Sequence, residues 1–173
     1  LAEYIAYAKA NPEKINYGMT GVGSTNHLAG AWLHSATNTK ATYVAYKGMA
    51  PIMQEMMAGR TDASVANLSV ALPHLKAGKL LALAILGDQR SKLAPDLRTV
   101  MEQGIPDYNY TNRLGFVAPA ATPPAIVNKL SEGLAKVARM PDVAGPFEAN
   151  GIIMVGSTPA QFRQILASEI DRW

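Results

Sequence analysis

The chain has 173 residues, of which 49% are hydrophobic and 17% are charged, so it is long enough to form a core and too apolar for a disordered protein. Its net charge of +3 is small and its basic residues are dispersed, which argues against a nucleic-acid partner. The absence of cysteine excludes disulfides and thiolate metal sites, and no apolar run reaches the roughly 18 to 20 residues of a membrane-spanning helix.

The first half of the chain alternates predicted helices with predicted strands. In chain order, the pattern predicts an opening helix, a strand at 14–18, a helix at 24–35, a strand at 41–46, a helix from about 51, a strand at 62–66, a helix near 69–77 and a strand at 79–86. Such alternation is typical of a parallel sheet covered by helices. Because the 79–86 segment is apolar on both strand faces, we expect it to be a central strand buried between two helical layers.

The chain after this strand predicts few further strands. A polar connector at 87–106 contains a short predicted helix near 97–103, and one more strand is predicted at 114–120. With so few strands after residue 113, the helices of this region are expected to lack sheet partners within the chain.

Two long helices are predicted in the last third of the chain. Thr122, with Pro123 at the first helical position, predicts the start of a helix with one apolar stripe, formed by Ile126, Leu130, Leu134 and Val137. Thr158 and Gln161 have the spacing of a capping box, which predicts the start of the final helix.

A glycine-rich turn joins the 14–18 strand to the next helix. Gly18 and Gly23 have the spacing of a Walker A loop, but Ser24 stands where that loop needs a lysine, and Asn26 stands at the third glycine of a dinucleotide fingerprint. A helix starting near Ser24 still offers unpaired N–H groups and the positive end of its dipole, which suit a single carboxylate or similar small anion. A purely structural interpretation, in which the glycines form the turn and Ser24 caps the helix, has equal standing at this point.

The three histidines do not form a metal site by spacing. His27 and His34 lie seven residues apart on about the same helix face, which separates them by about 10.5 Å at 1.5 Å per residue. His74 has no potential ligand at a suitable spacing, and no Gly-x-Ser-x-Gly motif surrounds any serine. We expect each histidine to be a hydrogen-bonded surface or core residue, and His27 has functional weight only because it lies in the first turn after the glycines.

Seven stretches of the sequence, in consistent order, carry a family resemblance: AYAKANPEKINYG, GVGSTNHLAG, VAYKGMAP, AGRTDASVANLSVALPHLKAGKLLALAI, APDLRTVMEQGIPDY, GFVAPAATPPAIVNKL and GSTPAQFRQILASEIDRW. They resemble the solute-binding proteins of tripartite tricarboxylate transporters, the Bug or TctC-like receptors. The resemblance implies an α/β fold of the type II periplasmic-binding-protein (flytrap) class. It also implies a periplasmic receptor that captures a small carboxylate or dicarboxylate and delivers it to the membrane permease subunits of the transporter. It implies neither an enzyme nor a cofactor.

The resemblance also implies which residues contact the ligand. The loop around the glycines matches the carboxylate grip, and Tyr46, Lys47 and Gly48 match the next loop that faces the cleft. The complete predicted set is Thr20, Gly21, Val22, Gly23, Ser24, Thr25, His27, Tyr46, Lys47, Gly48, Ala66, Asn67 and Arg113.

Two of these positions depart from the family pattern. Ala66 stands where an aspartate is frequent, which favours a carboxylate ligand without an amine, and Arg113 stands where a tryptophan is frequent, which makes it a candidate charge partner where the chain crosses between lobes. For Lys47 a solvated role is favoured over anion steering.

The resemblance further implies a division of the chain. Residues 1–112 are expected to form a complete second lobe, and 113–173 the returning part of a first lobe whose N-terminal strands precede the start of this sequence. The chain is therefore expected to be truncated at its N-terminus. With half of the cleft, three charge-assisted hydrogen bonds of about 1.5 to 3 kcal/mol each would be offset by an association cost of about 4 to 15 kcal/mol, so binding is expected to be millimolar or weaker.

Two alternatives remain open from the sequence. One is an enzyme acting on a small anionic substrate, with His27 as acid or base. The other is an interaction role, in which the helices without sheet partners cause self-association.

Overall fold

In the computed structural model, which describes residues 1–173, the chain divides into two units, Leu1–Asn112 and Arg113–Trp173. The first unit contains a three-stranded parallel sheet in the order β2-β1-β3, formed by Asn16–Met19 (β1), Thr42–Ala45 (β2) and Ala63–Ser64 (β3). In this sheet Tyr17 of β1 pairs with Tyr43 on one side and with Ala63 on the other. The expected α/β fold with a parallel sheet is therefore confirmed.

Helices connect and follow these strands. They are α1 (Ala2–Ala10), α2 (Thr25–Ala36), α3 (Met49–Met57), α4 (Leu68–Lys76) and the short 3-10 helix η1 (Met101–Gln103). Their number and order agree with the predicted pattern, although α3 starts two residues before the predicted position and η1 is only the end of the predicted 97–103 helix.

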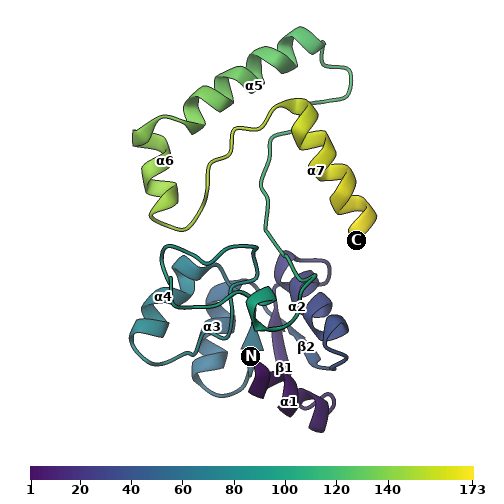
Figure 1. Ribbon diagram of the computed structural model, residues 1–173, viewed down its shortest axis with the longest axis vertical. Coiled ribbons are helices and arrows are strands. Elements are labelled where there is room, and N and C mark those ends of the chain that lie inside the picture. The colour runs from purple at the N-terminus through teal and green to yellow at the C-terminus, as the bar shows by residue number, and fades with distance from the viewer. The chain divides into compact units, whose positions relative to one another are not determined.

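The α2 and α3 helices cover opposite faces of the sheet (Figure 1). Tyr17 contacts α2, because its hydroxyl donates to the carbonyl oxygen of Asn26 at 2.8 Å. The next strand residue, Gly18, contacts α3, because a Cβ added to it would lie 2.7 Å from Cγ2 of Ile52. Successive side chains of a strand point to opposite faces, so the two helices sandwich β1.

Two clusters form the core of the first unit. One contains Ala8, Ile15, Tyr17 and Ala63 with the partly buried Tyr4 and Tyr43, and the other contains Leu33, Val100 and Tyr108 with Trp32, Ala84 and Leu86. Tyr108 is 1% exposed and donates to the carbonyl oxygen of Ala29 at 2.8 Å, which ties the end of this unit to α2.

The prediction of a central buried strand at 79–86 is wrong. This segment forms only an isolated parallel bridge between Ile85 and Thr99, and Leu81 is 81% exposed. Its apolar residues meet the second core cluster on one side only, through Ala84 and Leu86. A central strand needs partners along both edges, and here no strand of the sheet pairs with the segment.

The second unit contains three helices and no strand: α5 (Pro124–Ala138), α6 (Pro141–Glu148) and α7 (Pro159–Arg172). The strand predicted at 114–120 is therefore wrong, and Leu114, Phe116 and Val117 are each at least 80% exposed. The physical reason is that the unit offers no second strand to accept its backbone hydrogen bonds.

The starts of α5 and α7 can be compared with the starts predicted from the sequence. The N-cap of α5 is Pro123 rather than Thr122, and Pro124 occupies the first helical position, so the predicted start is one residue early. The predicted capping box is confirmed, since the Gln161 N–H donates to Thr158 Oγ1 and the Thr158 N–H donates to Gln161 Oε1. Helix α6 was not predicted. None of the helices in the structure has the length and apolar character needed to cross a membrane.

Candidate functional site

Three loops meet at the carboxyl edge of the sheet: 20–24 after β1, 46–48 after β2 and 65–67 after β3. They meet there because the three strands are parallel neighbours. The chain runs from β1 outward to β2 and then returns past β1 to β3, so the strand order reverses around β1. Ligands of open α/β sheets bind outside the carboxyl ends of the strands where such a reversal occurs.

The first of these loops, which we call the glycine turn, comprises Thr20 to Ser24. Gly21 and Gly23 have φ values of 129° and 78°, which L-residues with a side chain rarely adopt. Ser24 is the N-cap of α2, and its hydroxyl accepts from the His27 N–H at 3.4 Å. The structural role considered for Ser24 is therefore present in the molecule, and its hydroxyl also lies 2.7 Å from Gly21 O and from Asn26 Oδ1.

Four main-chain N–H groups of the glycine turn and the first turn of α2 have no hydrogen-bond partner in the structure. They belong to Gly21, Val22, Thr25 and Asn26. The first turn of α2 contains no acidic residue that could occupy its positive end. This arrangement leaves several donors at a helix N-terminus available to an anion.

His27 lies in the first turn of α2 and forms a hydrogen bond with the glycine turn. Its Nδ1 accepts from the Gly23 N–H at 3.1 Å, so the neutral ring carries its proton on Nε2 and can donate there. The ring also contacts the edge of Tyr43, with centroids 5.1 Å apart.

The second loop is fixed mainly by backbone contacts. The Tyr46 N–H donates to Met19 O at 2.8 Å, and its hydroxyl lies 2.8 Å from Thr61 Oγ1, so Tyr46 is tied to its own unit. Gly48, at a φ of 115°, is the N-cap of α3. Lys47 is exposed and forms no ion pair.

The third loop contains no charge. Ala66 is half-buried, and Asn67 is exposed and serves as the N-cap of α4 without a side-chain cap hydrogen bond. The carboxyl edge of the sheet therefore carries no acidic side chain in any of its three loops.

Arg113 belongs to the second unit and has a partner there. Its Nη1 donates to Glu169 Oε1 at 2.9 Å, and the same carboxylate accepts from the Trp173 Nε1–H at 2.8 Å. Arg113 is thus ion-paired with a protein carboxylate, and a ligand carboxylate would have to compete for it.

One residue important to the glycine turn was absent from the predicted set. Asn26 is 4% exposed, and its Oδ1 lies within hydrogen-bond distance of Thr20 N, Thr20 Oγ1 and Ser24 Oγ. The sequence does contain a sign of this role. Asn26 lies three residues before Ala29 and seven before Leu33, so its polar side chain falls on the buried face of α2.

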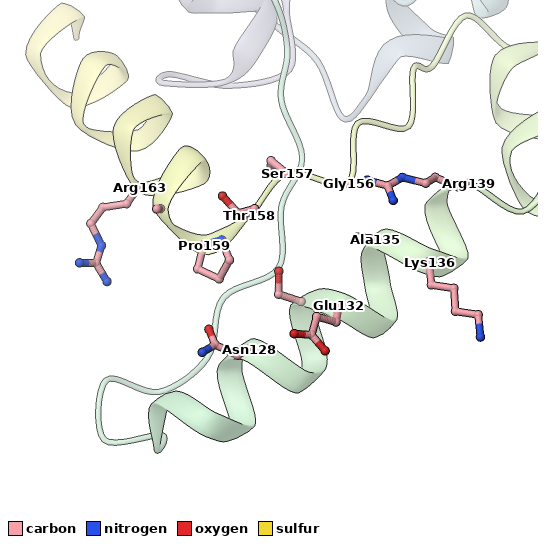
Figure 2. Close-up of a pocket in the computed structure, with 12 residues that line it drawn as sticks. Asn128, Glu132, Ala135, Lys136, Arg139, Gly156, Ser157, Thr158, Pro159 and Arg163 are labelled. Atoms are coloured by element: carbon pink, nitrogen blue, oxygen red, sulfur yellow. The ribbon is translucent and has the colours of Figure 1, made fainter.

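The second unit has a separate groove of about 770 Å³ between α5 and the N-terminus of α7 (Figure 2). Its charged lining residues are Glu132, Lys136, Arg139 and Arg163. The Lys136 and Arg163 side chains extend away from one another, so the charges do not converge on a common point. Nowhere in the chain do three or more His, Asp or Glu side chains gather to hold a metal ion.

Comparisons with known proteins agree along the whole chain. A family described as tripartite tricarboxylate transporter family receptor (TctC) matches residues 1–173. The chain is 31% identical to Protein BugT of Bordetella pertussis, an alignment that covers 98% of this chain and 52% of the relative. It is 33% identical to a protein from the TAR-I ttuE-ttuC' intergenic region of Agrobacterium vitis, covering 99% of this chain and 50% of the relative. The chain thus spans about half the length of these relatives.

Solved structures show the same fold. An adipate-bound protein of R. palustris, Rpa4515, has a TM-score of 0.87 and 30% identity, covering 100% of this chain and 58% of that chain. The malate-bound MatC of Rhodopseudomonas palustris has a TM-score of 0.79 and 25% identity, covering 100% of this chain and 60% of that chain.

Proposed function

Because this chain belongs to the tripartite tricarboxylate transporter receptor (TctC) family, we propose that it is the ligand-gripping part of a receptor for a small carboxylate. Members of this family are solute-binding receptors and not enzymes, which disfavours the alternative of His27 as a catalytic acid or base. The single observation that carries the proposal is the group of four unpaired N–H donors at the N-terminus of α2.

The proposed contact is made by neutral donors. The N–H groups of Gly21, Val22 and Thr25 bind one carboxylate of the ligand, and the Thr25 hydroxyl and His27 Nε2–H supply further donors. The remaining predicted residues, Thr20, Gly23, Ser24, Tyr46, Lys47, Gly48, Ala66 and Asn67, shape or border this edge of the sheet. No proton transfer is needed for capture and release.

The chemistry of the edge favours a ligand without an ammonium group. Ala66 and its neighbours offer no carboxylate that could pair with an amine. The relatives with bound adipate and malate support a dicarboxylate, in which one carboxylate meets the glycine turn and the other meets groups elsewhere.

We further propose that the two units belong to different lobes of the receptor. Residues 1–112 form one lobe, and 113–173 contribute to the other. The half-length coverage of the relatives and the strand-free second unit support this division. Arg113 stays a predicted partner of a ligand carboxylate, for which it would have to release Glu169.

The proposed location and partners follow from the family. A TctC-type receptor operates in the periplasm and passes its ligand to the membrane permease subunits of a tripartite transporter. For this chain both are proposals.

The test removes the main-chain donor of Thr25, together with its hydroxyl, without disturbing the helix. Thr25 is the first residue of α2, a position where proline is favoured. The residue before it, Ser24, has an extended backbone (φ −66°, ψ 159°), which is the conformation that a following proline requires. Isothermal titration calorimetry should compare adipate, malate and aspartate on the longest natural chain that contains these residues. Thr25→Pro should weaken the binding of adipate or malate about 10- to 100-fold, because a hydrogen bond to a charged group is worth about 1.5 to 3 kcal/mol.

Thr25→Ala is the matched control, since it keeps the N–H and removes the hydroxyl and the methyl group of the side chain. Equal affinity of Thr25→Pro and Thr25→Ala would exclude the main-chain donor from the site, and tighter binding of aspartate than of malate would contradict the proposed ligand class.

A further inference from the structure

The glycine turn is not held in place by packing. Apart from the adjoining residues of the chain, no atom lies within 4 Å of the position that a Cβ would occupy on Gly21 or Gly23. The unpaired donors of this turn nevertheless have to keep a fixed direction if they are to bind an anion. Polar contacts at the base of the turn are therefore what gives it a defined shape.

One buried oxygen joins both ends of the turn. Asn26 Oδ1 accepts from the Thr20 N–H at 3.2 Å and lies 3.0 Å from Thr20 Oγ1 and 2.7 Å from Ser24 Oγ. Thr20 directly precedes the first glycine and Ser24 directly follows the second. The main-chain carbonyl of Asn26 in turn accepts from the buried hydroxyl of Tyr17, which connects the base of the turn to β1.

The orientation of this side-chain amide is fixed by chemistry. A main-chain N–H can only donate, so the atom that faces Thr20 N has to be the oxygen. Nδ2 of Asn26 is consequently buried without a hydrogen-bond partner. A buried donor without a partner is unfavourable, and it is rare in folded proteins.

An aspartate would avoid this cost. Its carboxylate could accept from the same three donors, it has no N–H to leave unpaired, and it is favoured in the first turn of a helix. Hydrogen bonding and the helix dipole therefore favour aspartate at this position, against the cost of burying a carboxylate. An aspartate would, however, place a negative charge directly beneath the unpaired N–H groups of the glycine turn.

We propose that Asn26 is the positioning residue of the glycine turn, and that it is an amide because the space beneath a carboxylate-binding turn has to stay uncharged. The second part rests on the proposed function, whereas the first part does not.

The test uses the variants N26A and N26D on the longest natural chain that contains these residues. Amide hydrogen exchange by NMR follows the Thr20 N–H, with the N–H groups of Thr42 and Asp62 as controls, because each of these two donates a 2.8 Å backbone bond remote from the turn. N26A should speed exchange at Thr20 at least tenfold and leave the controls unchanged. N26D should keep Thr20 protected, yet bind adipate and malate at least tenfold more weakly.

Each outcome is decisive. Unchanged protection of Thr20 in N26A overturns the positioning role, and wild-type affinity for adipate and malate in N26D overturns the charge argument. Should N26A lose protection at Thr42 and Asp62 and so prove unfolded, the milder variant N26S, whose side-chain oxygen lies one bond closer to the backbone than the amide oxygen, replaces it in the exchange measurement at Thr20. A wild-type chain that binds neither acid overturns the proposed function and with it the charge argument, while the Thr20 exchange still decides the positioning role.

Discussion

Among individual residues, His34 has the most unusual surroundings. It is 4% exposed, with Nε2 lying 2.8 Å from the Tyr4 hydroxyl and Nδ1 lying 2.7 Å from the Tyr43 hydroxyl, and the edge of Tyr17 packs against its ring. The prediction that this histidine is a hydrogen-bonded residue is confirmed. Burial lowers the pKa of His34 and raises the pKa of Tyr4 and Tyr43, so all three groups are neutral at pH 7.

The buried imidazole makes stability depend on pH. In the unfolded chain His34 has an ordinary pKa of about 6.5, whereas in the folded chain its pKa is lower, so the unfolded state binds the extra proton first as pH falls. The free energy of unfolding should therefore be at its full value above about pH 7 and decrease as pH falls below about 6.5. Urea denaturation between pH 7.5 and 5.5 measures this slope.

Two variants test whether His34 causes this change of the free energy of unfolding with pH. His34→Gln should be less stable than wild type at pH 7.5 but show a flatter pH dependence, and His74→Gln, a change outside the tyrosine cluster, should keep the wild-type slope. An unchanged slope in His34→Gln would mean that other groups cause the pH dependence.

At the scale of elements, the spacing between α2 and the sheet depends on one glycine. A Cβ added to Gly30 would lie 2.5 Å from the Tyr17 hydroxyl oxygen and 2.6 Å from its Cε1, and Tyr17 is only 2% exposed. The ring therefore lies directly against the backbone of the helix. A helical glycine elsewhere, Gly133 of α5, has no atom within 4 Å of the same position apart from its chain neighbours and the backbone of its own helix.

These two glycines predict opposite effects of the same substitution. Gly30→Ala should destabilise the fold by about 1 to 3 kcal/mol, because the methyl group displaces the buried ring. Gly133→Ala should stabilise by up to about 1 kcal/mol, as alanine does in an open helical position. Melting curves followed by circular dichroism measure both, and a Gly30→Ala variant as stable as wild type would show that α2 can move outward freely.

Elements were predictable where their signals are local. The alternation of apolar segments with glycine and proline located β1, β2 and β3, and the sequence around Ser24 and Thr158 located two helix starts through side-chain caps. Helix α6 was missed because Pro146 interrupts its pattern, although Pro141 at its first position is a local start signal.

The errors arose where structure depends on distant partners. The segment 79–86 has the composition of a buried strand, but only neighbouring strands could make it one, and composition does not say whether they exist. For the same reason the contacts of Asn26 with Thr20 and of Tyr4 with His34 could not be predicted, because they join residues 6 and 30 positions apart that the fold brings together.

At the scale of the whole molecule, the second unit exposes more apolar surface than a monomer usually leaves in water. Besides the 114–117 segment, Ile153, Val155 and Ile170 are more than 70% exposed, and the apolar stripe of α5 is 40 to 55% exposed. Large exposed apolar patches are typical of surfaces that bind another protein surface.

The 173-residue chain by itself should therefore associate, whereas a fragment of residues 1–112 should be monomeric. Multi-angle light scattering after size-exclusion chromatography, at several concentrations, measures both masses. A monomeric 173-residue chain would show that the second unit folds over its own apolar residues in solution.

Gly23 in the glycine turn and Gly30 in α2 should tolerate different substitutions. At Gly23 an added Cβ would meet open space, so the obstacle is the handedness of the backbone, and asparagine is the replacement that such a backbone accepts most readily. Beneath the Tyr17 ring the obstacle is volume, and no replacement is small enough. Substitutions in the glycine turn would thus be selective by amino-acid type, whereas Gly30, seven residues after Gly23, should vary least.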